Sequence, residues 1–271
     1  MIKWKKLALA TADFLLGGYL VVAFTAFNKP DESAKLCTKV SINIADDNTN
    51  GFISAQEIKN RLQAAKLYPL NRPLRYADTR RIEEMLKSSP FVKTAQCYKT
   101  QDGEINISIT QMMPVIRIKA DNGDDYYIDD KNTIMPNAHY ANDIIIATGN
   151  INKWYATRCL SPMAKTIQSN ELWRKGIVQG NILPDRGVEL VPRVGDHAVY
   201  IGLLPTEGKP AERDTLIADF VRKKLDRLEK FYKYGLSQAG WNKYSYINLE
   251  FDNQIICKKR NYKKEDNNET E

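Results

Sequence analysis

The stretch from Leu7 to Phe27 constrains this chain most, because its 21 residues carry a single charge, on Asp13. At about 1.5 Å per residue, a helix of this length spans the ~30 Å hydrocarbon core of a bilayer. Three lysines and no acidic residue precede it, so the positive-inside rule keeps residues 1–6 in the cytoplasm. The sequence therefore predicts a cytoplasmic tail at 1–6, a transmembrane helix at 7–27, and the remaining chain beyond the membrane.

Two other interpretations of this stretch are less well supported. A cleaved signal peptide has a shorter apolar region of roughly 7–15 residues and a small-x-small cleavage site. Ala23-Phe24-Thr25 is a poor site of that kind. A buried core helix is disfavoured because the stretch has no polar face. The role of Asp13 stays open. Its carboxyl group either faces a partner helix, or it lies near the cytoplasmic end of the helix and there snorkels to the interface or is protonated.

Charge and cysteine content exclude some classes of function. The formal net charge is +7, but basic residues are dispersed among acidic ones, which gives little support to nucleic-acid binding. The cysteines at 37, 97, 159 and 257 form no C-x-x-C motif and have no histidine at metal-ligand spacing, so no metal or cofactor is expected. In an oxidising compartment Cys37 and Cys97 are the preferred disulfide, and four separate buried thiols are the alternative.

The first region beyond the predicted membrane helix has the pattern of a small α+β domain. Residues 28–36 read as a linker, and residues 37–113 as the domain. Ser54 is the expected N-cap of a helix, with Glu57 completing a capping box. Pro90 ends a second helix. The elements in order are a strand at 40–44, helices that begin after Ser54 and Asp78, and a hairpin of strands at 91–98 and 105–109. This β-α-α-β-β order predicts two helices on one face of a three-stranded sheet.

Residues 114–260 are richer in strands. Short alternating segments predict a mixed α+β domain dominated by an antiparallel sheet, and the charged residues 261–271 predict a disordered tail. Ser161 followed by Pro162 predicts the start of one helix. A longer helix is expected from about Glu212 to Tyr234, in which Asp219 and Lys223 have the spacing of an ion pair.

No motif in the chain predicts catalysis. The sequence lacks G-x-S-x-G, H-E-x-x-H and a phosphate-binding glycine loop. His139 and His197 fall in predicted loops, where we expect solvated side chains. The acidic pairs 124–125 and 129–130 fall in predicted turns, which favour aspartate for backbone reasons. Cys257 follows two isoleucines and is expected to be a small core residue.

The last predicted strand, Gln254 to Lys258, suggests a binding function. A strand at a free sheet edge can accept a partner's strand through main-chain hydrogen bonds. Lysines on an edge strand also commonly prevent such pairing, and this alternative stays open. A second exposed strand, Phe91 to Tyr98, offers a weaker candidate.

Several motifs resemble the FtsQ/DivIB cell-division family. The β-α-α-β-β order is that of a POTRA domain. Residues 90–95 read Pro-Phe-Val-Lys-Thr-Ala, similar to the family's P-F-V-x-x-A. Residues 111–118 read Gln-Met-Met-Pro-Val-Ile-Arg-Ile, close to Q-R-x-P-V-x-R-I, with Met112 in place of a frequent arginine.

The second region is similar to the β domain of the same family. The segments that carry this resemblance are Tyr126–Asp129 with Met135-Pro136, Leu190–Gly195, Lys224–Leu228 and Ile247–Asp252. The last segment is close to the family's hydrophobic-Asp-Leu-Arg-aromatic pattern, with Asn248 for aspartate and Glu250 for arginine. The resemblance covers roughly residues 1–260, in the right order.

The resemblance implies a non-enzymatic scaffold of the division septum. Such a protein crosses the inner membrane once, with a cytoplasmic N-terminus and periplasmic domains. It recruits FtsB and FtsL through its last strands, links early and late division proteins, and has further division partners at its POTRA domain. The partner-binding residues implied by the resemblance and the edge strand are Phe251, Asn253, Gln254, Ile255, Ile256, Cys257 and Lys258. The family's exposed apolar residue in the final strand has no clear counterpart here.

Two alternative functions remain at this point. One is another POTRA-containing assembly or secretion chaperone of the envelope. The other is a membrane-anchored periplasmic enzyme, which requires a pocket with converging polar groups and a perturbed pKa. The sequence shows no such site.

Overall fold

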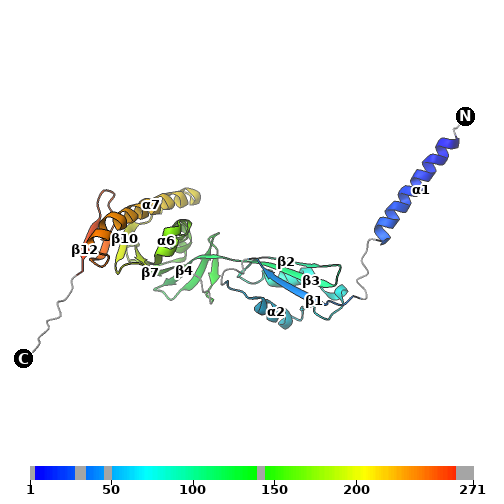
Figure 1. The fold of residues 1–271 in the computed structure, drawn as a ribbon, viewed down its shortest axis with the longest axis horizontal. Coiled ribbons are helices and arrows are strands. Elements are labelled where there is room, and N and C mark those ends of the chain that lie inside the picture. Colours follow the sequence, from blue (N-terminus) through cyan, green and yellow to red (C-terminus); the bar gives the residue numbers. More distant parts are fainter. Residues whose placement is uncertain (1–3, 28–34, 46–50, 139–143, 261–271) are drawn as a thin grey trace, which may run out of the picture. The chain divides into compact units, whose positions relative to one another are not determined.

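The computed structural model describes residues 4–27, 35–45, 51–138 and 144–260 (Figure 1). Most of the predicted linker at 28–36, His139, and the predicted disordered tail at 261–271 lie outside the described residues. The chain divides into two compact units. Residues 35–45 and 53–111 belong to the first unit, and residues 112–138 and 144–260 to the second.

Helix α1 spans Trp4–Phe27 and contains the apolar stretch. Over the part of the chain that the structure describes, no helix combines the length and hydropathy that a membrane span requires. The transmembrane helix therefore stays a prediction.

The first unit has the predicted β-α-α-β-β order. Its elements are β1 (Lys39–Ile44), α2 (Ala55–Ala64), the short 3₁₀ helix η1 (Leu74–Tyr76), α3 (Thr79–Lys87), β2 (Val92–Lys99) and β3 (Glu104–Gln111). The sheet order is β1-β3-β2, with β1 parallel and β2 antiparallel to the central β3.

Local sequence signals explain where these helices begin. The Ser54 hydroxyl accepts a hydrogen bond from the Glu57 amide, and the Asp78 carboxylate accepts one from the Arg81 amide. The Glu57 carboxylate binds the Arg61 guanidinium in place of completing the predicted capping box. Apolar residues of both helices and of β3 are buried in one core: Ile58, Leu62, Ile82, Leu86, Ile105, Ile107 and Ile109.

The second unit is a nine-stranded sheet with helices. Its strands are β4 (Pro114–Ala120), β5 (Asp125–Asp129), β6 (Ile134–Pro136), β7 (Ile145–Gly149), β8 (Ile177–Ile182), β9 (Gly187–Pro192), β10 (Ala198–Leu203), β11 (Tyr244–Asn248) and β12 (Ile256–Lys259). Its helical segments are α4 (Lys153–Tyr155), the π turn η2 (Ala156–Leu160), α5 (Ser161–Ser169), α6 (Glu171–Gly176), α7 (Pro210–Phe231), the π turn η3 (Tyr232–Leu236) and α8 (Ser237–Ala239).

The strand order in this sheet is β12-β11-β10-β9-β8-β7-β4-β5-β6. Five of the eight strand pairs are antiparallel, and the pairs β4–β7, β7–β8 and β10–β11 are parallel. Helices α5 and α7 share one continuous core with the strands. The predicted α+β class with a sheet-dominated second domain is confirmed.

The predicted start at Ser161 coincides with the first residue of α5, but Ser161 does not cap a free helix end there. Helical backbone begins earlier, after Asn152, whose side chain accepts a hydrogen bond from the Tyr155 amide, and runs through η2 into α5. Ser161 lies inside this segment and donates a hydrogen bond to Asn132. A proline inside a helix removes one i→i−4 hydrogen bond, and the π turn directly before Pro162 accommodates that loss.

All four cysteines are free thiols in this structure, so the predicted bridge between Cys37 and Cys97 is not formed. Cys97 is on β2, opposite Ile107 of β3, whereas Cys37 leads into β1 on the other side of β3. Two strand spacings of about 4.8 Å exceed the ~7 Å limit for the Cα atoms of a disulfide. The strand order therefore gives no support to this pairing.

The core of the second unit can be tested at Ile247 of β11, which is fully buried. We expect Ile247→Ala to lower the free energy of unfolding by about 2–5 kcal/mol, because apolar contacts are lost and a cavity remains. The half-exposed Ile256 on neighbouring β12 is the matched control, and Ile256→Ala should cost less than about 1 kcal/mol. Urea denaturation followed by tryptophan fluorescence reports this unit, since Trp154, Trp173 and Trp241 lie in it. Equal losses in the two variants would contradict the assignment of Ile247 to the core.

Candidate partner-binding edge of the second sheet

Strand β12 lies at one edge of the nine-stranded sheet. It pairs with β11 on one side, and its other side has no strand neighbour among the described residues. The strand begins at Ile256 and ends at Lys259, so Gln254 and Ile255 precede it, in contrast to the predicted span of 254–258.

The hydrogen-bond pattern shows which main-chain groups of β12 are free. The Arg260 amide donates to the Lys243 carbonyl, so residue 260 faces β11. In an antiparallel pair, successive residues face the partner strand and the opposite side in turn. The main-chain N–H and C=O groups of Lys258 and Ile256 therefore point toward β11. Those of Cys257 and Lys259 point toward the open edge. This edge is able to accept a further strand.

The side chains of β12 alternate between the two faces of the sheet. Cys257 lies opposite the buried Ile247 and packs against the core, and burial raises the pKa of its thiol. Ile256 is 48% exposed, and Lys258 and Lys259 are exposed. An exposed apolar side chain is thus present in this strand, at Ile256.

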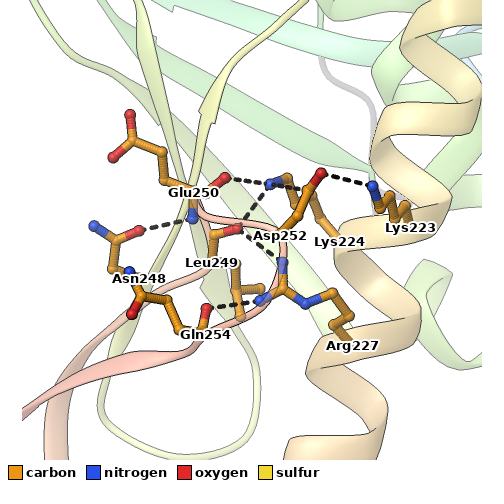
Figure 2. Close-up of polar contacts among 8 residues, drawn as sticks. All are labelled: Lys223, Lys224, Arg227, Asn248, Leu249, Glu250, Asp252 and Gln254. Atoms are coloured by element: carbon orange, nitrogen blue, oxygen red, sulfur yellow. Dashed lines mark hydrogen bonds and ion pairs between the residues drawn. The ribbon is translucent and has the colours of Figure 1, made fainter.

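A buried lysine of α7 holds the turn between β11 and β12 (Figure 2). The Lys224 side chain is 3% exposed. Its ammonium group donates hydrogen bonds to the carbonyl oxygens of Leu249, at 2.8 Å, and Glu250, at 2.6 Å. One carboxylate oxygen of Asp252 is 3.6 Å away. Burial lowers the pKa of Lys224, and the nearby Asp252 carboxylate opposes that shift.

Two further cations of α7 bind the same turn. Lys223 forms an ion pair of 2.8 Å with Asp252, and this contact holds the pKa of the Asp252 carboxyl below its usual value. The Arg227 guanidinium donates to the carbonyl of Gln254 at 2.7 Å and to that of Leu249 at 3.3 Å (Figure 2). The predicted pair between Asp219 and Lys223 is not formed, because Asp219 binds Arg222 and Lys223 binds Asp252.

Phe251 lies in this turn and is 47% exposed. The residues on either side of it, Glu250 and Asp252, are bound to Lys224 and Lys223, so its backbone is held in place. Asn253 and Gln254 are exposed, and Ile255 is partly buried against the core. An aromatic side chain on a pre-formed turn resembles the residues that dominate binding energy at interfaces.

A shallow groove of about 540 Å³ lies between the end of α7 and the segment before β12. Phe231, Tyr234 and Ile255 provide apolar surface, and Arg227 and Lys230 provide positive charge. Gly235 in the π turn η3 has no room for a side chain, because a Cβ atom there would lie 2.9 Å from the Phe231 ring. Gln254 and Ile255, which directly precede β12, also line the groove, so it adjoins the start of the free edge.

The predicted loop position of His197 was correct, but the expected solvation was wrong. The side chain is 5% exposed, and its Nε2 is 2.7 Å from the Tyr232 hydroxyl. Asp129 is also buried and accepts hydrogen bonds from the amides of Lys131 and Thr133, which is a turn-forming role. Over the described ranges, no group of three or more histidine, cysteine or acidic residues has the geometry to hold a metal ion.

The edge strand β2 of the first unit is less available than β12. The Cys97 amide of β2 donates to the Glu83 carboxylate of α3 at 2.8 Å, and this hydrogen bond lowers the pKa of Glu83. A side chain thus occupies a main-chain donor that an added strand would need.

Sequence reasoning did not identify Lys224 and Arg227 as supports of the turn. A signal was present, since Val221, Lys224, Leu225 and Leu228 follow the i, i+3, i+4, i+7 spacing of a buried helix face. A lysine at such a position needs buried acceptors. The identity of those acceptors depends on main-chain carbonyls, which have no sequence signature.

The role of Lys224 can be tested by Lys224→Met, which keeps the length of the side chain. We expect the free energy of unfolding to fall by about 1–3 kcal/mol, because two buried carbonyl groups lose a charged donor. Lys223→Met is the control and should cost less than about 1 kcal/mol, since the Lys223–Asp252 pair is exposed. Urea denaturation measures both. If Lys224→Met lost no more free energy of unfolding than the control, the conclusion that Lys224 holds the turn between β11 and β12 would be contradicted.

Comparisons with known protein families agree with this architecture. A model described as POTRA-like domain matches residues 35–110, and one described as FtsQ/DivIB, C-terminal related matches residues 113–258. No curated protein matches the chain. The second model covers more than half of the sequence and contains α7, the turn between β11 and β12, and β12 as far as Lys258. The chain therefore belongs to the FtsQ/DivIB family, a family of non-enzymatic cell-division scaffolds.

Proposed function

We propose that this protein is an inner-membrane division scaffold that recruits FtsB, in complex with FtsL, through the free edge of β12. In this proposal α1 crosses the membrane once, residues 1–6 are cytoplasmic, and both units lie in the periplasm at the septum. The observation that carries the proposal is the outward main chain of Cys257 and Lys259 at a sheet edge that no described strand covers.

The partner is proposed to add one strand to β12. Main-chain hydrogen bonds to Cys257 and Lys259 supply affinity, and side chains on either side of the new strand supply specificity. On one face, the partner's side chains meet Ile256. On the other face of the sheet, the partner's side chains approach the groove lined by Phe231 and Tyr234, and this groove suits an apolar side chain. Phe251 and Asn253 extend this contact at the turn.

Positive charge at the edge favours an acidic partner segment. Lys230, Lys258 and Lys259 have no ion pair among the described residues, in contrast to Lys223, which binds Asp252. Unpaired lysines on an edge also discourage pairing with a second copy of the same basic strand. The two interpretations of these lysines are therefore compatible: the charge opposes self-association and selects a partner of opposite charge.

The free edge can be tested at Lys259, whose N–H points outward. We expect Lys259→Pro to weaken binding of the full-length chain to co-purified FtsB/FtsL by about tenfold, because proline lacks this donor and its ring occupies the partner's position. Lys259→Thr keeps the donor but removes the charge, and it should weaken binding less. Fluorescence anisotropy at fixed salt measures the affinities, and circular dichroism checks that each variant is folded.

The outcomes separate the parts of this proposal. Equal affinities of the proline and threonine variants would show that the β12 edge is not the interface. No binding by the folded wild-type chain would overturn recruitment of FtsB/FtsL itself.

A further inference from the structure

The far end of β12 is held by a charged side chain that lies beside the buried His197. The Arg260 guanidinium binds the main-chain oxygen of Asp196 and forms an ion pair of 2.6 Å with the Asp196 carboxylate. Asp196 and His197 lie in the turn between β9 and β10. Residue 260 directly follows β12, so this turn anchors the end of the free edge.

His197 is enclosed on several sides. Its ring contacts the Tyr232 ring edge-on, with centroids 5.5 Å apart, and Nε2 is 2.7 Å from the Tyr232 hydroxyl. Gly195, at φ +83°, covers the opposite edge, where a Cβ atom would lie 2.7 Å from Nδ1. Nδ1 is buried and has no hydrogen-bond partner among the described residues. The site therefore suits a neutral imidazole with one polar contact.

Protonation of this ring has two costs in the closed arrangement. In the imidazolium both nitrogens carry hydrogen, so whichever neutral tautomer is present, Nδ1–H becomes part of a charged donor group and has no acceptor. Protonation also places a second positive charge next to Arg260, whose Nε is likewise buried without a partner. The charged groups that act on His197 are Asp196, which favours protonation, and Arg260, which opposes it. The Asp196 carboxylate already binds Arg260, and burial keeps Tyr232 a neutral phenol by raising its pKa.

We propose that His197 is a pH-sensitive switch for the C-terminal end of β12. An imidazolium gains an acceptor for Nδ1–H only if the β9–β10 turn moves so that Gly195 no longer covers the ring. Because Asp196 lies in the same turn, this movement separates Asp196 from Arg260. Acidification thus releases the end of the strand that carries the outward Lys259. Release of the strand end by acid requires no partner. The consequence of this release for FtsB/FtsL binding rests on the proposed function.

The sign follows from proton linkage. Burial lowers the pKa of His197 below its ordinary value of about 6.5. The closed state then binds fewer protons than the open state. The stability of the closed state relative to the open state is therefore greatest above pH ~6.5 and decreases as pH falls below that value. At pH 5.5 the opening equilibrium should have risen relative to pH 7.5, by at most about tenfold, since the open state gains at most one proton over one pH unit.

Hydrogen exchange of the full-length chain tests this proposal. Peptides that contain residues 256–260 are compared at pH 7.5 and 5.5, with rates corrected for the intrinsic effect of pH. We expect protection to fall, by up to about tenfold, in the wild type and to be unchanged by pH in His197→Gln, which keeps a side-chain donor but does not titrate. An equal fall in both proteins, or no fall in the wild type, would overturn the proposal.

A second measurement keeps the test decisive if His197→Gln does not fold. The chain has two histidines, so an NMR titration of labelled imidazole carbons needs only His139→Gln for assignment. We expect His197 to titrate below pH 6.5, and the loss of protection at residues 256–260 to occur between pH 6.5 and that midpoint. A His197 midpoint at or above 6.5, or one unrelated to the exchange, would contradict the switch.

Discussion

The arrangement of the candidate binding edge depends on one buried ammonium group, that of Lys224. Removing a charge from water is costly unless polar partners replace the solvent. Here the carbonyl oxygens of Leu249 and Glu250 and the carboxylate of Asp252 provide those partners. The same contacts fix the path of the chain between β11 and β12. The exposed Phe251 and the start of the free strand are therefore positioned by α7, a long helix packed in the core (Figure 2).

Strand β12 is held mainly by polar contacts at its two ends. It has four residues, of which Cys257 alone is partly buried, so apolar burial gives it little stability. Lys224 and Arg227 hold the turn before it, and Arg260 is bound to Asp196 after it. Between these anchors, the outward main chain is free. An edge that is fixed before binding loses less conformational entropy when a partner strand is added.

The sequence predicted the features that depend on local patterns. The caps at Ser54 and Asp78, the alternating strand at Ile105 to Ile109 and the α+β class all follow from spacing and residue type. The helix start predicted at Ser161 is the first residue of α5, but the sequence did not reveal the helical backbone before it, which reaches Pro162 through a π turn. The supports of the candidate site were missed, since Lys224 and Arg227 bind main-chain carbonyls that any residue could provide.

His197 shows why burial in a turn is hard to read from sequence. Its neighbours Gly195 and Asp196 are typical of an exposed turn, and the Asp196 side chain is indeed exposed. The ring is buried against a residue distant in sequence, Tyr232 in η3, whose ring in turn contacts Trp241. The free energy needed to keep an enclosed histidine unprotonated rises as pH falls. Lys224, at the other end of β12, instead keeps its charge among fixed acceptors. The two ends of the edge strand therefore differ in their response to acid: the anchor at the turn persists, and the anchor at Arg260 weakens.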